Sequence, residues 1–189
     1  MSPTVSLVIP SYNRAGLIGE TIASALAQDE AFHEIIVVDD GSTDGTAQIL
    51  AGYGDRIKTI FLTNGGVQRA RNTGVAQATG DFVTLCDSDD LLTPDFLSTA
   101  MAWFRRHPEY EAFYSNFVTF HDLGLHPDKL SGAPAGFFDG AKEDGDYLYD
   151  IPDLYARTVE YQPLFMSGCI VSRALYERLG GFDTRFIRT

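Results

Sequence analysis

The chain has 189 residues, 44% of them hydrophobic, which is enough for a sizeable core in one domain or in one domain with a partial second unit. Its 14 Lys and Arg residues stand against 26 Asp and Glu, a formal net charge of -12 with no basic run, which argues against a nucleic-acid partner. Cys86 and Cys169 lie in apolar runs, as buried thiols do in a reducing compartment, so we predict a cytoplasmic protein. Because no apolar stretch reaches 18 residues, we expect no transmembrane segment, although peripheral membrane association stays open.

Strand and helix patterns alternate in the first half of the chain. Short runs of mostly β-branched or aromatic residues predict four buried strands, at residues 4–9, 34–39, 57–62 and 81–86. Apolar residues at helical spacing predict helices between them, at about 15–28, 43–51 and 66–78. Because strand, helix and strand follow one another repeatedly, we expect parallel pairing with right-handed crossovers. The fold class is therefore α/β, with helices on both faces of the sheet.

The second half is less regular. Thr93 as N-cap and Pro94 at the first helical position predict a fourth helix that runs to about Arg106. A strand is expected at 111–120, and residues 121–150 are rich in Gly, Pro and Asp, too long for an ordinary connection. The chain is expected to close with a short helix, an apolar run and another helix, at 151–158, 165–171 and 172–180.

Polar segments follow all four predicted strands of the first half. Ligands of open α/β sheets bind beyond the carboxyl ends of the strands, so these segments can meet at one rim. They read "PSYNR", "DDGSTDGT", "TNGGVQRARNTG" and "CDSDD". Turns and helix caps would explain any one of them, and Ser42 or Thr43 is expected to cap the next helix. Paired and clustered carboxylates together with Arg69 and Arg71 indicate a ligand site instead.

The last of these segments places Asp87, Asp89 and Asp90 within four positions. Like charges raise one another's pKa, so such carboxylates are either well solvated or hold a cation. Oxygen ligands without His or Cys favour Mg²⁺ or Mn²⁺, which uses one or two carboxylates and completes its shell with water and phosphate oxygens. Arg71 could donate a charge-assisted hydrogen bond to the same phosphates. The pattern therefore predicts a phosphate-bearing ligand bound with a divalent metal.

Two common nucleotide signatures are missing. No G-x-G-x-x-G follows the first strand, where Pro10 takes the place of the first glycine, and the chain has no G-x-x-x-x-G-K-[ST]. The ligand is therefore not expected to be NAD or an ATP held by a P-loop.

Five segments in this order resemble the family 2 glycosyltransferases with the GT-A fold: "VSLVIPSYNR", "IIVVDDGSTDGT", "NGGVQRARNTG", "GDFVTLCDSDD" and "GGFD". The resemblance runs from about Val5 to Asp183. It implies a mixed, mostly parallel GT-A sheet in a single domain, with a nucleotide-binding part at about 1–106 and an acceptor-side part at about 107–189. It also implies metal-assisted transfer of a sugar, with inversion, from a nucleoside-diphosphate sugar to an acceptor hydroxyl. By the family's habit the donor would be UDP-linked, and the acceptor a sugar, a glycan or a lipid-linked molecule.

The resemblance also assigns roles to individual residues. Donor binding is assigned to Pro10, Tyr12, Asp39, Asp40, Arg71, Asp87 and Ser88. The first two would border the nucleobase, the acidic pair would bind the base or ribose, and Arg71 would lie near the base and diphosphate. The last two would face the ribose and sugar. Asp89 would ligate the Mn²⁺ or Mg²⁺ that bridges the diphosphate. For Asp90 two roles stay open: a metal ligand, or a carboxylate on the helix side that only supports the site.

No catalytic residue is assigned, so the general base is unknown. In this family the base usually belongs to an acidic pair after the "GGFD" turn, and the chain reaches Thr189 before such a pair, so we expect a truncated C-terminus. Asp183 is the nearest candidate, but it also fits a structural turn. One alternative is a fragment that binds the donor without turnover. A phosphatase or nucleotidyltransferase fits less well, because Pro10 stands where a nucleophilic Asp or a Gly-rich phosphate loop would be needed.

Overall fold

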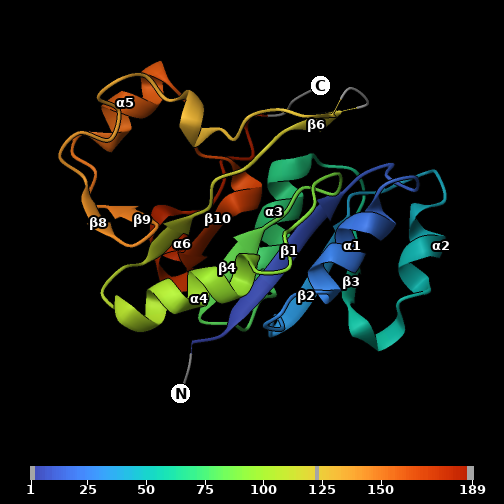
Figure 1. Cartoon of the computed structure of the whole chain (residues 1–189). Helices are drawn as coiled ribbons and strands as arrows, with labels where there is room; N and C mark the ends of the chain where they lie inside the picture. The colour runs from blue at the N-terminus through green and yellow to red at the C-terminus, as the bar shows by residue number, and fades with distance from the viewer. Residues whose placement is uncertain (1–2, 122–123, 187–189) are drawn as a thin grey trace. The chain divides into compact units, whose positions relative to one another are not determined.

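The computed structural model describes residues 3–121 and 124–186 of the chain (Figure 1). The chain forms two compact units, one made of residues 1–113 and 166–189 and the other of residues 114–165. No helix among the described residues is long and apolar enough to cross a membrane.

The larger unit is built on a six-stranded sheet in the order β3-β2-β1-β4-β10-β5 (Figure 1). Its strands are β1 Val5–Ser11, β2 Glu34–Asp39, β3 Lys58–Phe61, β4 Phe82–Leu85, β5 Ala112–Tyr114 and β10 Cys169–Ser172. β1 pairs in parallel with both β2 and β4, and β2 in parallel with β3, whereas β10 runs antiparallel to β4. The predicted mixed, mostly parallel α/β sheet is confirmed.

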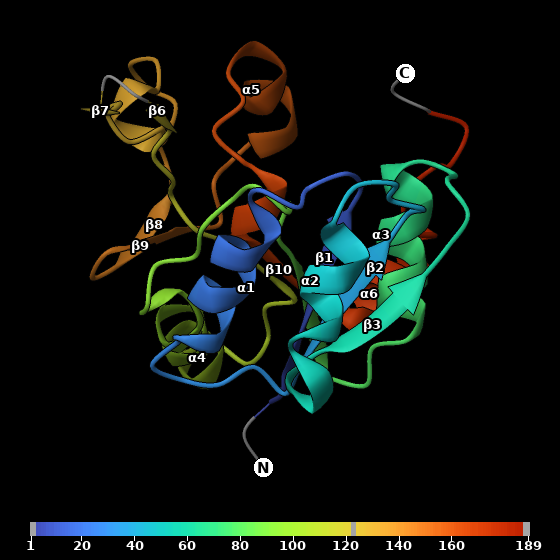
Figure 2. The same cartoon turned by 90° about the vertical axis from the view of Figure 1, so that its right-hand side faces the viewer.

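Helices cover both faces of this sheet. They are α1 Ile18–Leu26, α2 Thr46–Ala51, α3 Val67–Ala76, α4 Phe96–Arg106 and α6 Arg173–Leu179, with short 3₁₀ turns η1 Gly54–Arg56 and η3 Met166–Gly168. Figure 2 shows α1 and α4 to the left of the sheet and α3 to its right. Because consecutive residues of a strand point to opposite faces, each central strand contributes side chains to both layers.

The core is centred on β1, all seven residues of which are buried. Val8, Ile36 and Val38 pack with Ala70 and Val75 of α3 on one face. The intervening residues of the same strands are also almost wholly buried, as expected for a sheet covered on both sides. The carboxyl ends of β1, β2 and β4 are thereby fixed side by side.

Two predicted strands need correction. Residues 57–62 were expected to form a buried strand, but β3 covers only Lys58–Phe61 and both of its end residues are exposed, because β3 is the edge of the sheet. The strand expected at 111–120 ends at Tyr114. Beyond it the backbone bonds locally instead, since the N–H groups of Phe117 and Leu130 both donate to the Asn116 side-chain oxygen.

Two predicted helix starts were also wrong. α4 begins at Phe96 with Asp95 at its N-cap position, because the N–H of Phe96 donates to the carbonyl of Thr93 in a turn that precedes the helix. α2 begins at Thr46, and its N-cap position is Gly45 rather than Ser42 or Thr43. The hydroxyl of Ser42 is bonded to Asp39 instead.

The smaller unit has little regular structure. Its elements are β6 Phe120–His121, β7 Gly124–Leu125, η2 Leu130–Gly132, β8 Lys142–Asp144, β9 Tyr147–Tyr149 and α5 Leu154–Glu160. β6 and β7 form one antiparallel pair, β8 and β9 another. Arg157 of α5 donates to the carbonyls of Gly136, Phe137 and Asp139 and so holds the irregular segment before it.

Gly74 lets α3 pack closely against the sheet. A Cβ at this position would lie 2.2 Å from Cγ1 of Val8 and 3.1 Å from Cγ2 of Val38. We expect Gly74→Ala to lower the free energy of unfolding, measured by urea titration, by about 1–3 kcal/mol. Alanine favours helices, but here its methyl group would overpack a buried contact. The matched control is Gly19→Ala in α1, where the added Cβ would meet only Tyr53 Oη at 3.7 Å. That variant should be unchanged or stabilised by about 0.5–1 kcal/mol, and equal effects of the two substitutions would contradict the assignment.

Candidate donor-binding site

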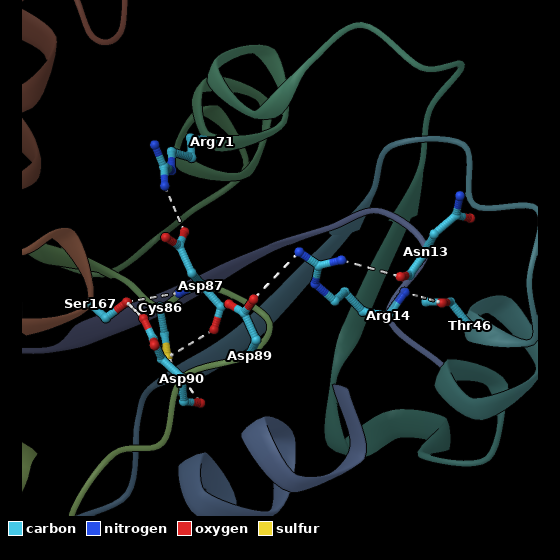
Figure 3. Close-up of polar contacts among 9 residues, drawn as sticks. All are labelled: Asn13, Arg14, Thr46, Arg71, Cys86, Asp87, Asp89, Asp90 and Ser167. Carbon is cyan, nitrogen blue, oxygen red and sulfur yellow. Dashed lines mark hydrogen bonds and ion pairs between the residues drawn. The ribbon is translucent and has the colours of Figure 1, made fainter. Parts of the chain in front are cut away.

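The loops that follow β1 and β2 are fastened to each other. The N–H of Asn13 donates to Oγ of Ser42 at 2.8 Å, and Oδ1 of Asn13 accepts from the N–H of Thr43 at 2.8 Å. The N–H of Arg14 donates to Oγ1 of Thr46, a fully buried residue, at 3.0 Å (Figure 3). Asn13 has a φ of 52°, a left-handed conformation that asparagine tolerates better than most residues. These bonds fix the direction in which the Arg14 side chain leaves the loop.

Pro10 and Tyr12 lie at the end of β1. The prediction ended this strand at Ile9, but it continues to Ser11, and Pro10 is buried opposite Val38 of β2. Proline is tolerated here because the ladder with β4 extends only to Val8, so no partner on that side requires its missing N–H. Tyr12 is 45% exposed and follows the strand directly.

The acidic pair at the end of β2, Asp39 and Asp40, is nearly fully buried. Oδ1 of Asp39 accepts from the N–H of Ser42 at 3.0 Å and from its hydroxyl at 2.5 Å. The carboxylate of Asp40 accepts from the N–H groups of Gly65 at 3.0 Å and Gly66 at 2.7 Å, directly before α3. The pair therefore holds the loops after β2 and β3 in place, a function in addition to any contact with a ligand.

The segment after β4, residues 86–90, carries Asp87, Asp89 and Asp90 and is called the acidic loop. Arg71 on α3 reaches this loop. Its Nη2 lies 2.6 Å from Oδ1 of Asp87, and the two side chains are only 11% and 28% exposed. The guanidinium carbon lies 5.2 Å from the ring centroid of Phe182, within cation–π range. Nε of Arg71 is buried without a hydrogen-bond partner among the described residues. The pairing partly neutralises the loop where a diphosphate would add negative charge.

The acidic loop is held from behind by Ser167 of η3. The Ser167 hydroxyl accepts from the N–H of Asp87 at 3.0 Å and donates to the carboxylate of Asp90 (Figure 3). The N–H of Asp90 donates to the carbonyl of Asp87 at 3.0 Å, closing a turn in which Ser88 is buried. Burial raises the pKa of Asp90, and the neighbouring charges of Asp87 and Asp89 add to the effect. Asp90 therefore faces the interior of the larger unit.

Asp89 is the carboxylate of this loop that faces outward. Its Oδ2 lies 3.4 Å from Nη2 of Arg14, and the two side chains are 44% and 42% exposed. No group of three or more His, Cys, Asp or Glu side chains within residues 3–121 and 124–186 is arranged to hold a metal ion. An exposed carboxylate still fits Mg²⁺ or Mn²⁺ when phosphate oxygens complete the shell, because these ions need only one or two protein carboxylates.

Sequence reasoning missed Ser167 and Asn72. Ser167 lies in a run that reads as apolar, and only the Ser-Gly pair within it signals a turn. Oδ1 of Asn72 accepts from the N–H of Phe182 at 2.9 Å and from the Tyr176 hydroxyl at 2.6 Å, and its Nδ2 donates to the carbonyl of Phe182 at 2.8 Å. Burial raises the pKa of Tyr176 to about 12, so its hydroxyl remains a donor. Asn72 thereby anchors the "GGFD" turn beside Arg71.

Asp183 at the end of that turn is paired locally. Both of its oxygens accept from Nε of Arg185 at 3.0 Å, and its Oδ2 accepts from Nη2 at 2.6 Å. Hydrogen bonds from Arg185 hold the pKa of Asp183 below its usual value. A low pKa does not suit a general base that must take up a proton near neutral pH.

Known structures resemble the whole described fold. A crystal structure of TarS residues 1–349 from S. aureus aligns with a TM-score of 0.72 at 26% identity, covering 98% of this chain and 52% of that one. The mannosyltransferase PcManGT from Pyrobaculum calidifontis, in complex with GDP-Man and Mn²⁺, aligns with a TM-score of 0.64 at 25% identity, covering 97% of this chain and 48% of that one. The sheet and helices are therefore those of a GT-A glycosyltransferase.

Similar sequences point the same way. TuaG of Bacillus subtilis, named as a glycosyltransferase of teichuronic acid biosynthesis, is 42% identical over 136 residues, 70% of this chain and 54% of TuaG. EpsE of the same organism, also named as a glycosyltransferase, is 35% identical over 133 residues, 68% of this chain and 48% of EpsE. The chain thus spans about half the length of these relatives. Residues 6–149 match the family described as Glycosyl transferase family 2, and the chain belongs to this family.

Proposed function

We propose that the protein binds a nucleoside-diphosphate sugar with Mn²⁺ or Mg²⁺ and transfers the sugar, with inversion, to an acceptor hydroxyl. The observation that carries this proposal is the acidic loop after β4, in which Asp87 and Asp89 are each paired with an arginine from a different element. Carboxylates and guanidinium groups side by side can bind both a divalent cation and the diphosphate that the cation bridges.

A UDP-linked donor is the best supported choice. TarS is known in complex with UDP-GlcNAc and with UDP, and these structures align at 27% and 25% identity with a TM-score of 0.70 each. We propose that Tyr12 and Pro10 border the base, that the Asp39 and Asp40 pair lies next to the base and ribose, and that Arg71 binds near the diphosphate. Tyr12 supports this arrangement because its ring is exposed where β1 ends.

We propose different roles for the residues of the acidic loop. We assign Asp89 to the metal, because its carboxylate is the most outward of the three, and Asp87 with Ser88 to the ribose and sugar side. Bound Mn²⁺ or Mg²⁺ would act as a Lewis acid that stabilises the negative charge on the departing nucleoside diphosphate. Arg71, held by Asp87 and the Phe182 ring, keeps a cation beside that diphosphate.

We also propose a class of acceptor and a cytoplasmic place for the reaction. The name of TuaG favours an acceptor used in polysaccharide biosynthesis, which can be a sugar, a glycan or a lipid-linked molecule. Residues of about 1–106 would then bind the donor and those of about 107–189 the acceptor side, in a cytoplasmic protein. Since Asp183 is engaged by Arg185, a second function also has support: donor binding by this chain without turnover.

Transfer assays separate the two functions. We expect the chain to bind UDP in the presence of Mn²⁺, and this binding to raise its melting temperature by mass action. Release of UDP from UDP-GlcNAc or another UDP-sugar by the 189-residue chain would exclude binding without turnover. Binding without any release of UDP would exclude transfer by this chain alone.

Asp89→Asn tests the metal assignment. The substitution keeps the size of the side chain and removes its charge, so calorimetry should show at least ~10-fold weaker binding of UDP with Mn²⁺, as loss even of a group that supports a metal ligand costs ~10–100-fold. Asp55→Asn is the control, since it changes the same charge on an exposed residue of η1, before β3 and away from the rim. Equal affinities in wild type and Asp89→Asn would refute the role of Asp89.

Ser167→Ala tests whether the acidic loop must be held from behind. Loss of the hydroxyl leaves the N–H of Asp87 and the carboxylate of Asp90 without this partner, which should cost about 1–3 kcal/mol of unfolding free energy. Binding of UDP with Mn²⁺ should weaken by ~10-fold, and Ser167→Thr, which keeps the hydroxyl, should restore most of it. Ser98→Ala in α4 removes a hydroxyl that bonds only the local carbonyl of Asp95 and serves as control. Unchanged affinity of Ser167→Ala would show that the loop needs no such support.

A further inference from the structure

We propose that Arg14 is the counter-cation of Asp89 in the free protein and is exchanged for the divalent metal when the donor binds. The released guanidinium would then serve the diphosphate. This inference rests on the proposed function, since it takes Asp89 as the metal ligand. It adds a residue of the loop after β1 to the donor site and gives that residue two successive partners.

Arg14 is built into the rim and is not a freely moving surface residue. Its backbone N–H is bonded to the buried Thr46, and the residues on either side are also fastened, Asn13 to Ser42 and Ala15 to Asp44. From this fixed base the side chain crosses from the loop after β1 to the loop after β4 (Figure 3). The fold therefore fixes the backbone of Arg14 within reach of Asp89, while its side chain can exchange partners.

The Arg14–Asp89 pair differs from the second ion pair of the loop. Its closest N–O distance is 3.4 Å with side chains 42% and 44% exposed, whereas Arg71 lies 2.6 Å from Asp87 with side chains 11% and 28% exposed. A long, solvent-exposed ion pair contributes little to stability, so a divalent cation can displace it. The short, more buried Arg71–Asp87 pair is suited to stay in place, with the Phe182 ring against its guanidinium.

The guanidinium of Arg14 has donors that lack good acceptors in this structure. Its Nε is buried without a hydrogen-bond partner among the described residues, and its Nη1 makes one long bond of 3.4 Å to the carbonyl of Asn13. A buried donor without an acceptor is costly, and a phosphate oxygen would satisfy it. The exchange leaves every charge paired. The metal would replace Arg14 beside Asp89, and the diphosphate would supply anionic acceptors for Arg14.

The exchange predicts two opposite effects of removing the charge of Arg14. Mn²⁺ alone should bind more tightly, because it no longer competes with a cation for Asp89. UDP in the presence of saturating Mn²⁺ should bind more weakly, because the guanidinium that the metal releases is no longer there to bind a phosphate. If Arg14 only supported the fold, its substitution would weaken the binding of both ligands. If Arg14 lay outside the site, its substitution would change neither affinity.

The experiment measures the binding of Mn²⁺ alone by electron paramagnetic resonance, and of UDP with saturating Mn²⁺ by calorimetry, on Arg14→Gln and the wild type. Loss of an exposed ion pair should raise the Mn²⁺ affinity about two- to five-fold, and the affinity for UDP with saturating Mn²⁺ should fall by a similar or larger factor. Arg14→Lys retains the charge and should stay within about two-fold of the wild type for Mn²⁺. Arg56→Gln in η1 removes the same charge before the amino end of β3, whereas Arg14 follows the carboxyl end of β1. This control should change neither affinity.

Each result has a separate meaning. If Arg14→Gln binds Mn²⁺ no more tightly than the wild type does, while Asp89→Asn still loses binding of UDP with Mn²⁺, the exchange is wrong and the proposed function stands. If Arg56→Gln strengthens Mn²⁺ binding as much as Arg14→Gln, the effect is one of net charge and the exchange is also wrong. If the wild type binds no UDP with Mn²⁺, the proposed function fails and the inference fails with it.

Discussion

Repulsion among the three carboxylates of the loop after β4 is the constraint to which the rest of the site responds. Each carboxylate is compensated in a different way: Asp87 by a short ion pair with Arg71, Asp89 by a long one with Arg14, and Asp90 by the Ser167 hydroxyl and a raised pKa. The compensating groups come from the loop after β1, from α3 and from η3. Two arginines, Arg14 and Arg71, therefore lie at the most acidic loop of a chain whose formal net charge is -12.

The sheet makes this compensation possible. Because β1 is central and parallel to both β2 and β4, the loops that follow these strands leave the same edge and can bond to one another. The antiparallel β10 brings η3 next to β4, so that Ser167, 80 positions after Asp87, supports the acidic loop. Gly74 lets α3 pack closely on β1 and β2, and the same helix carries Arg71, which pairs with Asp87.

The sequence predicted the regular part of the fold well, because apolar runs and helical spacing act over short distances. It failed where neighbours in space decide: the exposed edge strand β3, the early end of β5 at Tyr114, and the start of α4 at Phe96. The candidate site shows the same division. Asp87, Asp89 and Arg71 stand out as a pattern of charges, whereas Ser167 and Asn72 act through partners 80 and 110 residues away, which no local pattern reveals.

By itself the sequence determined the α/β class, the order of the strands' polar endings and the family, because these depend on residue types and their spacing along one chain. Only the tertiary structure decided how the charges are shared. It turned Asp90 inward and Asp89 outward, used Asp39 and Asp40 to hold loops, and set Arg14 against the carboxylate proposed for the metal. The reason is physical, since the strength of each ion pair depends on distance and burial, and both are fixed by packing between segments far apart in the chain.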